Sequence, residues 1–257
     1  MSAAGTSRRL ASQVHVDVAA NAEAAAELAA SSIAVHLHAA VAARGRASLA
    51  LSGGSTPARM IELLAADDLP WSSISLFQVD ERVVADDDLA RNWHTLSPVA
   101  LRLPSSQCHP MPVDGVDATD EQALGAAVDA YAETLRATGG DPPVLDVVHL
   151  GLGDDGHTAS LTPGDPALQA SHRSVAATVP YRGHRRITLT FPVINAARAV
   201  VWLVVGADKS AAVAALARQD PGLVASRVAR DRATLIVDSA AGQGALSAAF
   251  TGWPPKA

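Results

Sequence analysis

The chain has 257 residues, 49% of them apolar, which is enough to bury the core of one large α/β domain or two small ones. Lysine and arginine total 20 against 26 aspartates and glutamates, so the net charge of −6 offers no basic field for nucleic acid or an anionic membrane. A single cysteine, Cys108, excludes a disulfide framework and an all-cysteine metal site. Because no apolar run is long enough for a signal peptide or a membrane span, we expect a cytoplasmic protein.

Short runs rich in Val, Ile and Leu alternate with Ala-rich helical stretches, which is typical of βαβ units and a parallel sheet. Strands are expected at residues 14–18, 48–52, 74–79, 144–150, 187–191, 199–205 and 234–237, and helices at 22–43, from 57, at 121–136, from 208 and after the last strand. Residues 80–117 and 163–186 predict long loops or a small cap over the sheet edge. We expect residues 1–13 to form a flexible arm and residues 14–257 a single α/β domain.

The first candidate motif is Ser52–Pro57, which follows a buried strand and runs into a helix. Gly53 and Gly54 let the backbone approach an anion, Ser55 and Thr56 add hydroxyl donors, and the helix N-terminus supplies positive potential. The motif predicts a phosphate-binding loop, and the alternative is a tight turn with an ordinary Ser/Thr cap. It is not a nucleotide P-loop, because no Gly-Lys-Ser/Thr follows.

The second motif is Asp80-Glu81-Arg82 at the end of another expected strand, with Asn92 a short loop later. Three consecutive charged residues that leave a buried strand are costly unless they face a cleft. The alternative is a solvated loop, which is what most charge runs are. Asp80, Arg82 and Asn92 are therefore candidate binding residues.

The third motif, Gly151–Gly164, presents Asp155 and His157 where a parallel sheet places its ligand. An aspartate beside an imidazole fixes its tautomer and raises its basicity, as a general base for water requires. We therefore predict that His157 is the base and that Asp155 assists it. His149 lies inside the strand and is interpreted as a core residue with satisfied hydrogen bonds.

The same glycines match the dinucleotide pattern G-x-G-x-x-G, but the context argues against a nicotinamide cofactor. Asp154 and Asp155 would repel a pyrophosphate, and Pro163 comes too soon for the long helix that the pattern needs.

Further along, Arg186 begins a strand and Lys209 lies at a helix start. Both cations are candidates to close on a bound phosphate, and a solvated Lys209 is the alternative.

Together these motifs resemble the 6-phosphogluconolactonase family, in the right order and over most of the chain. The resemblance is carried by Ser52–Pro57, Asp80–Arg82 with Asn92, Gly151–Gly164, Arg186–Thr190 and Gly206–Lys209. The Gly-x-Gly-x-Asp-Gly-His element is shared with glucosamine-6-phosphate deaminases, so it identifies the superfamily. The lactonase branch is favoured because deaminases have a Glu five residues after the histidine, where this chain has Thr162.

The resemblance implies a Rossmann-like, doubly wound sheet without a nucleotide, and hydrolysis of 6-phospho-D-glucono-1,5-lactone to 6-phosphogluconate in the oxidative pentose phosphate pathway. It implies that His157 activates water, Asp155 orients the ring and Arg82 stabilises the oxyanion. Ser55 and Thr56, with Arg186 and Lys209, would hold the phosphate. No cofactor is expected, and Asp155 with His157 gives too few ligands for a catalytic zinc.

Two other functions remain open at this point. One is a deaminase or isomerase of the same superfamily. The other is a non-catalytic sugar-phosphate sensor of a transcription regulator. Such a sensor carries a DNA-binding helix pair, for which residues 1–14 have no room. The expected partner is a small sugar-phosphate lactone, and we expect a monomer or weak homo-oligomer.

Overall fold

The computed structural model describes residues 15–243, so the arm expected at residues 1–13 lies outside the described residues. Most strands of this part form one seven-stranded sheet in the order β1-β10-β9-β6-β2-β3-β5, and every neighbouring pair is parallel. The strands are β1 His15–Ala19, β2 Ala47–Leu51, β3 Ile74–Gln78, β5 Cys108–His109, β6 Val147–Leu150, β9 Ala199–Val204 and β10 Ala233–Asp238. The predicted α/β, mostly parallel sheet is confirmed.

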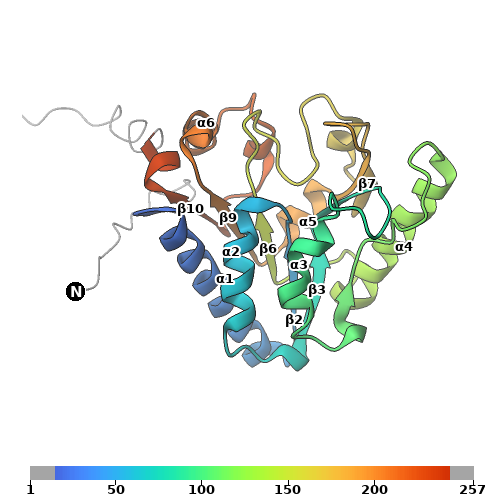
Figure 1. Cartoon of the computed structure of the whole chain (residues 1–257), viewed down its shortest axis with the longest axis horizontal. Coiled ribbons are helices and arrows are strands. Elements are labelled where there is room, and N and C mark those ends of the chain that lie inside the picture. Colours follow the sequence, from blue (N-terminus) through green and yellow to red (C-terminus); the bar gives the residue numbers. More distant parts are fainter. Residues whose placement is uncertain (1–14, 244–257) are drawn as a thin grey trace, which may run out of the picture.

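Helices cover both faces of this sheet, as a doubly wound fold requires (Figure 1). On one face α1, α2 and α3 stand side by side, and the other face is covered by α4, α5 and α6. The bounds are α1 Ala22–Arg44, α2 Ser55–Ala66, α3 Asn92–Ala100, α4 Glu121–Gly139, α5 Phe191–Ala196 and α6 Ser210–Arg218. Residues 239–243 begin a further helix after β10.

The first helix shows how local sequence sets its limits. Asn21 accepts a hydrogen bond from the amide of Ala24 at 2.9 Å, and Gly45 ends the helix in the left-handed region at φ 70°. Within residues 15–243, α1 alone is long and apolar enough to meet the criteria for a membrane span. Its alanine-rich face packs on α2, β9 and β10, and core helices meet the same criteria.

A second, antiparallel sheet of three short strands lies beside the carboxyl ends of the main sheet, in the order β4-β8-β7. It consists of β4 Asp80–Arg82, β7 Val175–Ala177 and β8 Arg186–Leu189. Val79 joins the two sheets, because its amide donates to Leu51 in the main sheet and its carbonyl accepts from Leu189 in the small one. This sheet is the small cap that the irregular ranges predicted.

Three details of the predicted element order are wrong. Residues 80–117 are not a long loop, because they contain β4, α3 and β5. The strand expected at 187–191 is β8 of the antiparallel sheet and not part of the parallel one, and it stops at Leu189 because Pro192 lies in the first turn of α5. The second helix begins at Ser55 and not at Pro57.

Candidate active site

A cavity of about 290 Å³ lies at the carboxyl ends of β2, β6 and β9. From β2 the chain proceeds to β3 on one side, and β6 lies on the other side, so the order reverses between β2 and β6, where open α/β sheets bind ligands. Ten of the eleven predicted site residues line the cavity: Gly53, Gly54, Ser55, Thr56, Asp80, Arg82, Asn92, His157, Arg186 and Lys209. The eleventh, Asp155, does not line the cavity, but it hydrogen-bonds to the His157 ring, which does.

The predicted phosphate loop leads from β2 into the first turn of α2. No room exists for a side chain at Gly53, because a Cβ there would come within 2.6 Å of Asn92, and Gly54 has φ +106°, which favours glycine. The Gly54 amide faces Thr95 Oγ1 at 3.4 Å. The alternative of an ordinary Ser/Thr cap is wrong, because α2 has no side-chain cap. Its first-turn amides therefore keep their capacity to bind an anion.

His157 and Asp155 form a hydrogen-bonded pair at the end of the glycine-rich loop. Asp155 Oδ1 lies 2.5 Å from His157 Nδ1 and 3.1 Å from the His157 amide. Partial burial acts to raise the pKa of Asp155, but hydrogen bonds from His157 and Tyr181 outweigh it and lower the pKa overall. Since the ionised carboxylate accepts, Nδ1 carries a proton, and in the neutral ring Nε2 is the nitrogen that can accept one.

The loop between β7 and β8 adds Tyr181, which the sequence analysis missed. Its hydroxyl donates to Asp155 Oδ2 at 2.9 Å, and its ring packs edge-on against His157 with centroids 5.4 Å apart. Partial burial and the Asp155 carboxylate raise the pKa of Tyr181, so the hydroxyl keeps its proton. Its neighbour Arg182 also lines the cavity and pairs with Asp154 at 2.9 Å. Only their place in an irregular, glycine-containing loop marked them in the sequence.

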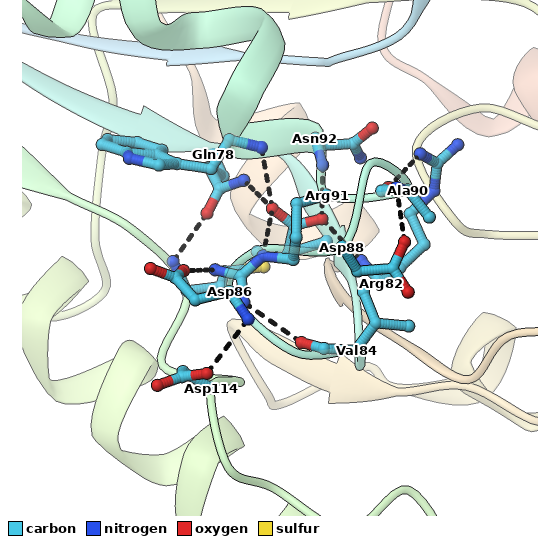
Figure 2. Close-up of polar contacts among 12 residues, drawn as sticks. Gln78, Arg82, Val84, Asp86, Asp88, Ala90, Arg91, Asn92 and Asp114 are labelled. Atoms are coloured by element: carbon cyan, nitrogen blue, oxygen red, sulfur yellow. Dashed lines mark hydrogen bonds and ion pairs between the residues drawn. The ribbon is translucent and has the colours of Figure 1, made fainter.

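The charged cluster of β4 divides into cavity-lining and buried parts. Asp80 accepts from Ser160 Oγ at 2.5 Å, and Asn92 Nδ2 donates to the Asp80 carbonyl at 2.9 Å. Arg82 Nη1 donates to the Ala90 carbonyl at 2.6 Å (Figure 2), while Arg82 Nε is buried without a hydrogen-bond partner among residues 15–243. The cluster is therefore not the solvated loop that was the alternative.

Glu81, between these residues, is fully buried and does not line the cavity. Gln78, Arg91 and Asn92, which are labelled in Figure 2, all contact its carboxylate. The carboxylate accepts from the amides of Arg82, Asn92 and Trp93 at 2.7–2.9 Å and from Gln78 Nε2 at 2.6 Å, and it lies 3.3 Å from Arg91 Nε. Glu81 thus supplies the missing N-terminal cap of α3.

Two predicted cations lie at the cavity. Arg186 on β8 is buried, its guanidinium packs 5.2 Å from the Tyr181 ring centroid, and burial lowers its pKa. Its Nε has no hydrogen-bond partner within the described range. Lys209 immediately precedes α6, with its Nζ 3.3 Å from Asp208 Oδ2. Arg185, next to Arg186, pairs with Glu121 and does not line the cavity.

His149 corrects one interpretation of the sequence. It is buried at 1% exposure, as expected, but its hydrogen bonds are not satisfied: neither ring nitrogen has a partner among the described residues. It also lines the cavity. Between residues 15 and 243, no group of three or more His, Cys, Asp or Glu side chains could hold a metal ion.

An open parallel sheet with an uncapped helix start, four cationic side chains and a His–Asp pair at one crevice is typical of an α/β enzyme for a small phosphorylated ligand. The chain belongs to the family of glucosamine-6-phosphate isomerases/6-phosphogluconolactonase, whose model matches residues 20–237.

Its relatives include the curated 6-phosphogluconolactonase of Synechocystis, 37% identical over 236 residues, which cover 89% of this chain and 97% of the relative. The 6-phosphogluconolactonase of Mycobacterium tuberculosis is 42% identical over 187 residues, or 69% of this chain and 75% of that one. The solved 6-phosphogluconolactonase of Leishmania guyanensis is 30% identical, with a TM-score of 0.78 over 89% of this chain and 97% of that one. A monomeric glucosamine-6-phosphate deaminase, 18% identical with a TM-score of 0.71 over 89% of this chain and 99% of that one, shares the fold.

Proposed function

We propose that this protein hydrolyses 6-phospho-D-glucono-1,5-lactone to 6-phosphogluconate in the oxidative pentose phosphate pathway. The names of its relatives support this function. The observation that carries the proposal is the His157–Asp155 pair, which lies beside a cavity with an uncapped helix start and four cationic side chains. We also propose a cytoplasmic location and a monomer or weak homo-oligomer.

In this mechanism His157 Nε2 takes a proton from a water molecule as the water oxygen attacks the lactone carbonyl. The resulting tetrahedral oxyanion collapses, the ring ester oxygen leaves, and the imidazolium returns the proton to that oxygen. Asp155 holds the Nδ1 proton and stabilises the transient positive charge on the ring. Water and lactone are thereby converted into the open-chain acid with no other reactant.

The remaining residues bind and position the substrate. Arg82 is the proposed donor to the oxyanion, since its buried Nε lacks a hydrogen-bond partner among residues 15–243. The first turn of α2, with Ser55 and Thr56, holds the phosphate together with Arg186 and Lys209. Binding this remote group positions the ester beside His157.

The deaminase alternative is disfavoured by Thr162, which is buried and stands where deaminases have a glutamate. We expect the purified protein to release acid from 6-phosphogluconolactone well above the spontaneous rate, without added nucleotide or metal and in the presence of a chelator. A pH-stat assay measures this release. Ammonia release from glucosamine 6-phosphate without lactone hydrolysis would replace the proposal with the deaminase function.

A second prediction concerns the phosphate. Lys209→Ala and Arg186→Ala should each weaken binding of the phosphorylated lactone roughly ten- to a hundredfold, because each removes a charge-assisted contact of about 1.5–3 kcal/mol. Arg185→Ala is the matched control, since this neighbour pairs with Glu121 outside the cavity. Steady-state kinetics on phosphorylated and unphosphorylated lactone measure the effect, and equal turnover of the two lactones would contradict it.

A further inference from the structure

His149 is a buried polar side chain for which the proposed mechanism has no use. It is the third residue of β6, the central strand of the sheet, and is 1% exposed. Both of its ring nitrogens lack a hydrogen-bond partner among residues 15–243. Burial lowers the pKa of His149 to about 3, so at neutral pH the ring is uncharged and has one donor and one acceptor. Buried polar groups without hydrogen-bond partners destabilise a fold, so we expect the His149 ring to form a hydrogen bond with a bound ligand.

The strand register shows which side of the sheet this ring faces. His149 lies opposite Val201 on β9, and since side chains alternate, Leu203 projects from the same face. Val201 and Leu203 belong to the apolar cluster that α1, α2 and α3 cover. His149 and Leu203 both line the cavity, together with Pro57 in the first turn of α2. The imidazole therefore lies on the side of the sheet that α2 covers, next to the cavity lining, and both of its nitrogens are enclosed in the ligand-free protein.

A direct contact ties the strand that carries this ring to the phosphate loop. Ser52 Oγ donates to the His149 carbonyl at 3.0 Å, and Ser52 is the first residue of that loop. The sheet and this bond therefore fix the phosphate loop relative to the backbone of His149. The phosphate loop and His149 both line the cavity, so an anion on the first-turn amides of α2 would lie in the cavity that His149 also lines.

We propose that His149 is a ligand-binding residue that donates a neutral N–H from the floor of the cavity to the phosphoryl group of the bound sugar phosphate. The inference rests on the proposed phosphate site and adds a residue to it. A neutral donor suits this position, because a phosphoryl oxygen accepts hydrogen bonds and two cations already supply the charge. The ligand then satisfies a donor that the protein itself leaves unpaired.

The test compares stability with affinity. His149→Leu preserves much of the size of the side chain and removes both nitrogens, so the ligand-free variant should melt at a higher temperature than the wild type. Its affinity for 6-phosphogluconate and for inorganic phosphate, measured by calorimetry, should fall roughly three- to tenfold, which corresponds to one hydrogen bond. His149→Gln, which keeps a donor, should recover part of the affinity. A purely structural histidine would leave both affinities unchanged.

The matched control is His109→Leu. His109 is a partly buried ring on β5, stacked on Phe77 at 4.6 Å, and does not line the cavity, so its loss should not alter affinity. Nitrogen NMR of the wild-type imidazoles tests the inference even if His149→Leu does not fold. Addition of inorganic phosphate should move the His149 ring resonances, assigned from the His149→Gln spectrum. Unmoved resonances in phosphate-saturated protein would overturn the inference, and because binding needs no turnover, this outcome is independent of lactonase activity.

Discussion

His157→Asn should lower turnover by about 10²–10⁴-fold and leave the affinity for the phosphorylated substrate nearly unchanged. The asparagine cannot accept the proton of the attacking water, so the loss falls on the transition state, while the phosphate contacts at α2, Arg186 and Lys209 persist. Turnover of the wild type should also fall as the pH is lowered, because only the neutral ring is a base. The lowered pKa of Asp155 favours its ionised form, which keeps accepting the hydrogen bond from His157 Nδ1.

The controls for this prediction are Asp155→Asn and the double variant. Asp155→Asn should cost less than His157→Asn, and adding it to the His157 change should cost little more, because residues that act as a unit are not additive. Kinetics at several pH values, with folding checked by circular dichroism, measure these differences. Near-normal turnover by a folded His157→Asn protein would remove this residue from the mechanism and direct attention to Asp80.

Glu81→Gln should destabilise the fold by about 3–5 kcal/mol, the cost of leaving a buried charge without its partner. The Arg91 side chain is 2% exposed and lies 3.3 Å from the Glu81 carboxylate, so the substitution removes its buried partner and leaves only the ion pair with Asp86, a side chain that is 71% exposed. The same carboxylate accepts from two backbone amides at the start of α3, those of Asn92 and Trp93, and from the amide of Arg82 in β4. Urea denaturation should show a lower midpoint, and activity should fall as well because Arg82 and Asn92 lose their anchor.

Glu121→Gln is the matched control, because Glu121 pairs with Arg185 at the surface with 77% of its side chain exposed. Ion pairs of this kind contribute little to stability, so its denaturation midpoint should stay close to that of the wild type. If Glu81→Gln were as stable as this control, the buried cap would not hold α3 in place.

The sequence predicted the parallel sheet and the position of the cavity because both follow from local patterns. Each buried strand is a short apolar run. The polar motifs at Ser52 and Gly151 directly follow β2 and β6, and the motif at Gly206 begins two residues after β9. Parallel strands bring their carboxyl ends to one edge, so motifs far apart in the chain had to meet there. That these residues bind substrate and catalyse its hydrolysis stays a prediction.

What the sequence could not predict depends on contacts between distant segments. The helix α3 contains Pro98 and is capped by Glu81, eleven residues before Asn92, so no local signal marks its start. The strand β4 has three residues and exists through its pairing with β8, about a hundred residues away. Tyr181 hydrogen-bonds to Asp155 from a loop whose sequence has no recognisable motif. That the His149 ring nitrogens lack hydrogen-bond partners can be seen only from the positions of the surrounding residues.

The register of β4 on β8 has a consequence for the ligand-free protein. Arg82 lies directly opposite Arg186, so two guanidinium groups face each other across an antiparallel pair, where like charges repel. Both line the cavity. An anion between the two guanidinium groups attracts both of them and offsets their repulsion. Binding should therefore stabilise the pairing of β4 with β8. The melting temperature should therefore rise with 6-phosphogluconate, and Arg82→Gln should shrink that rise; an equal rise in the variant would mean that this repulsion is already screened.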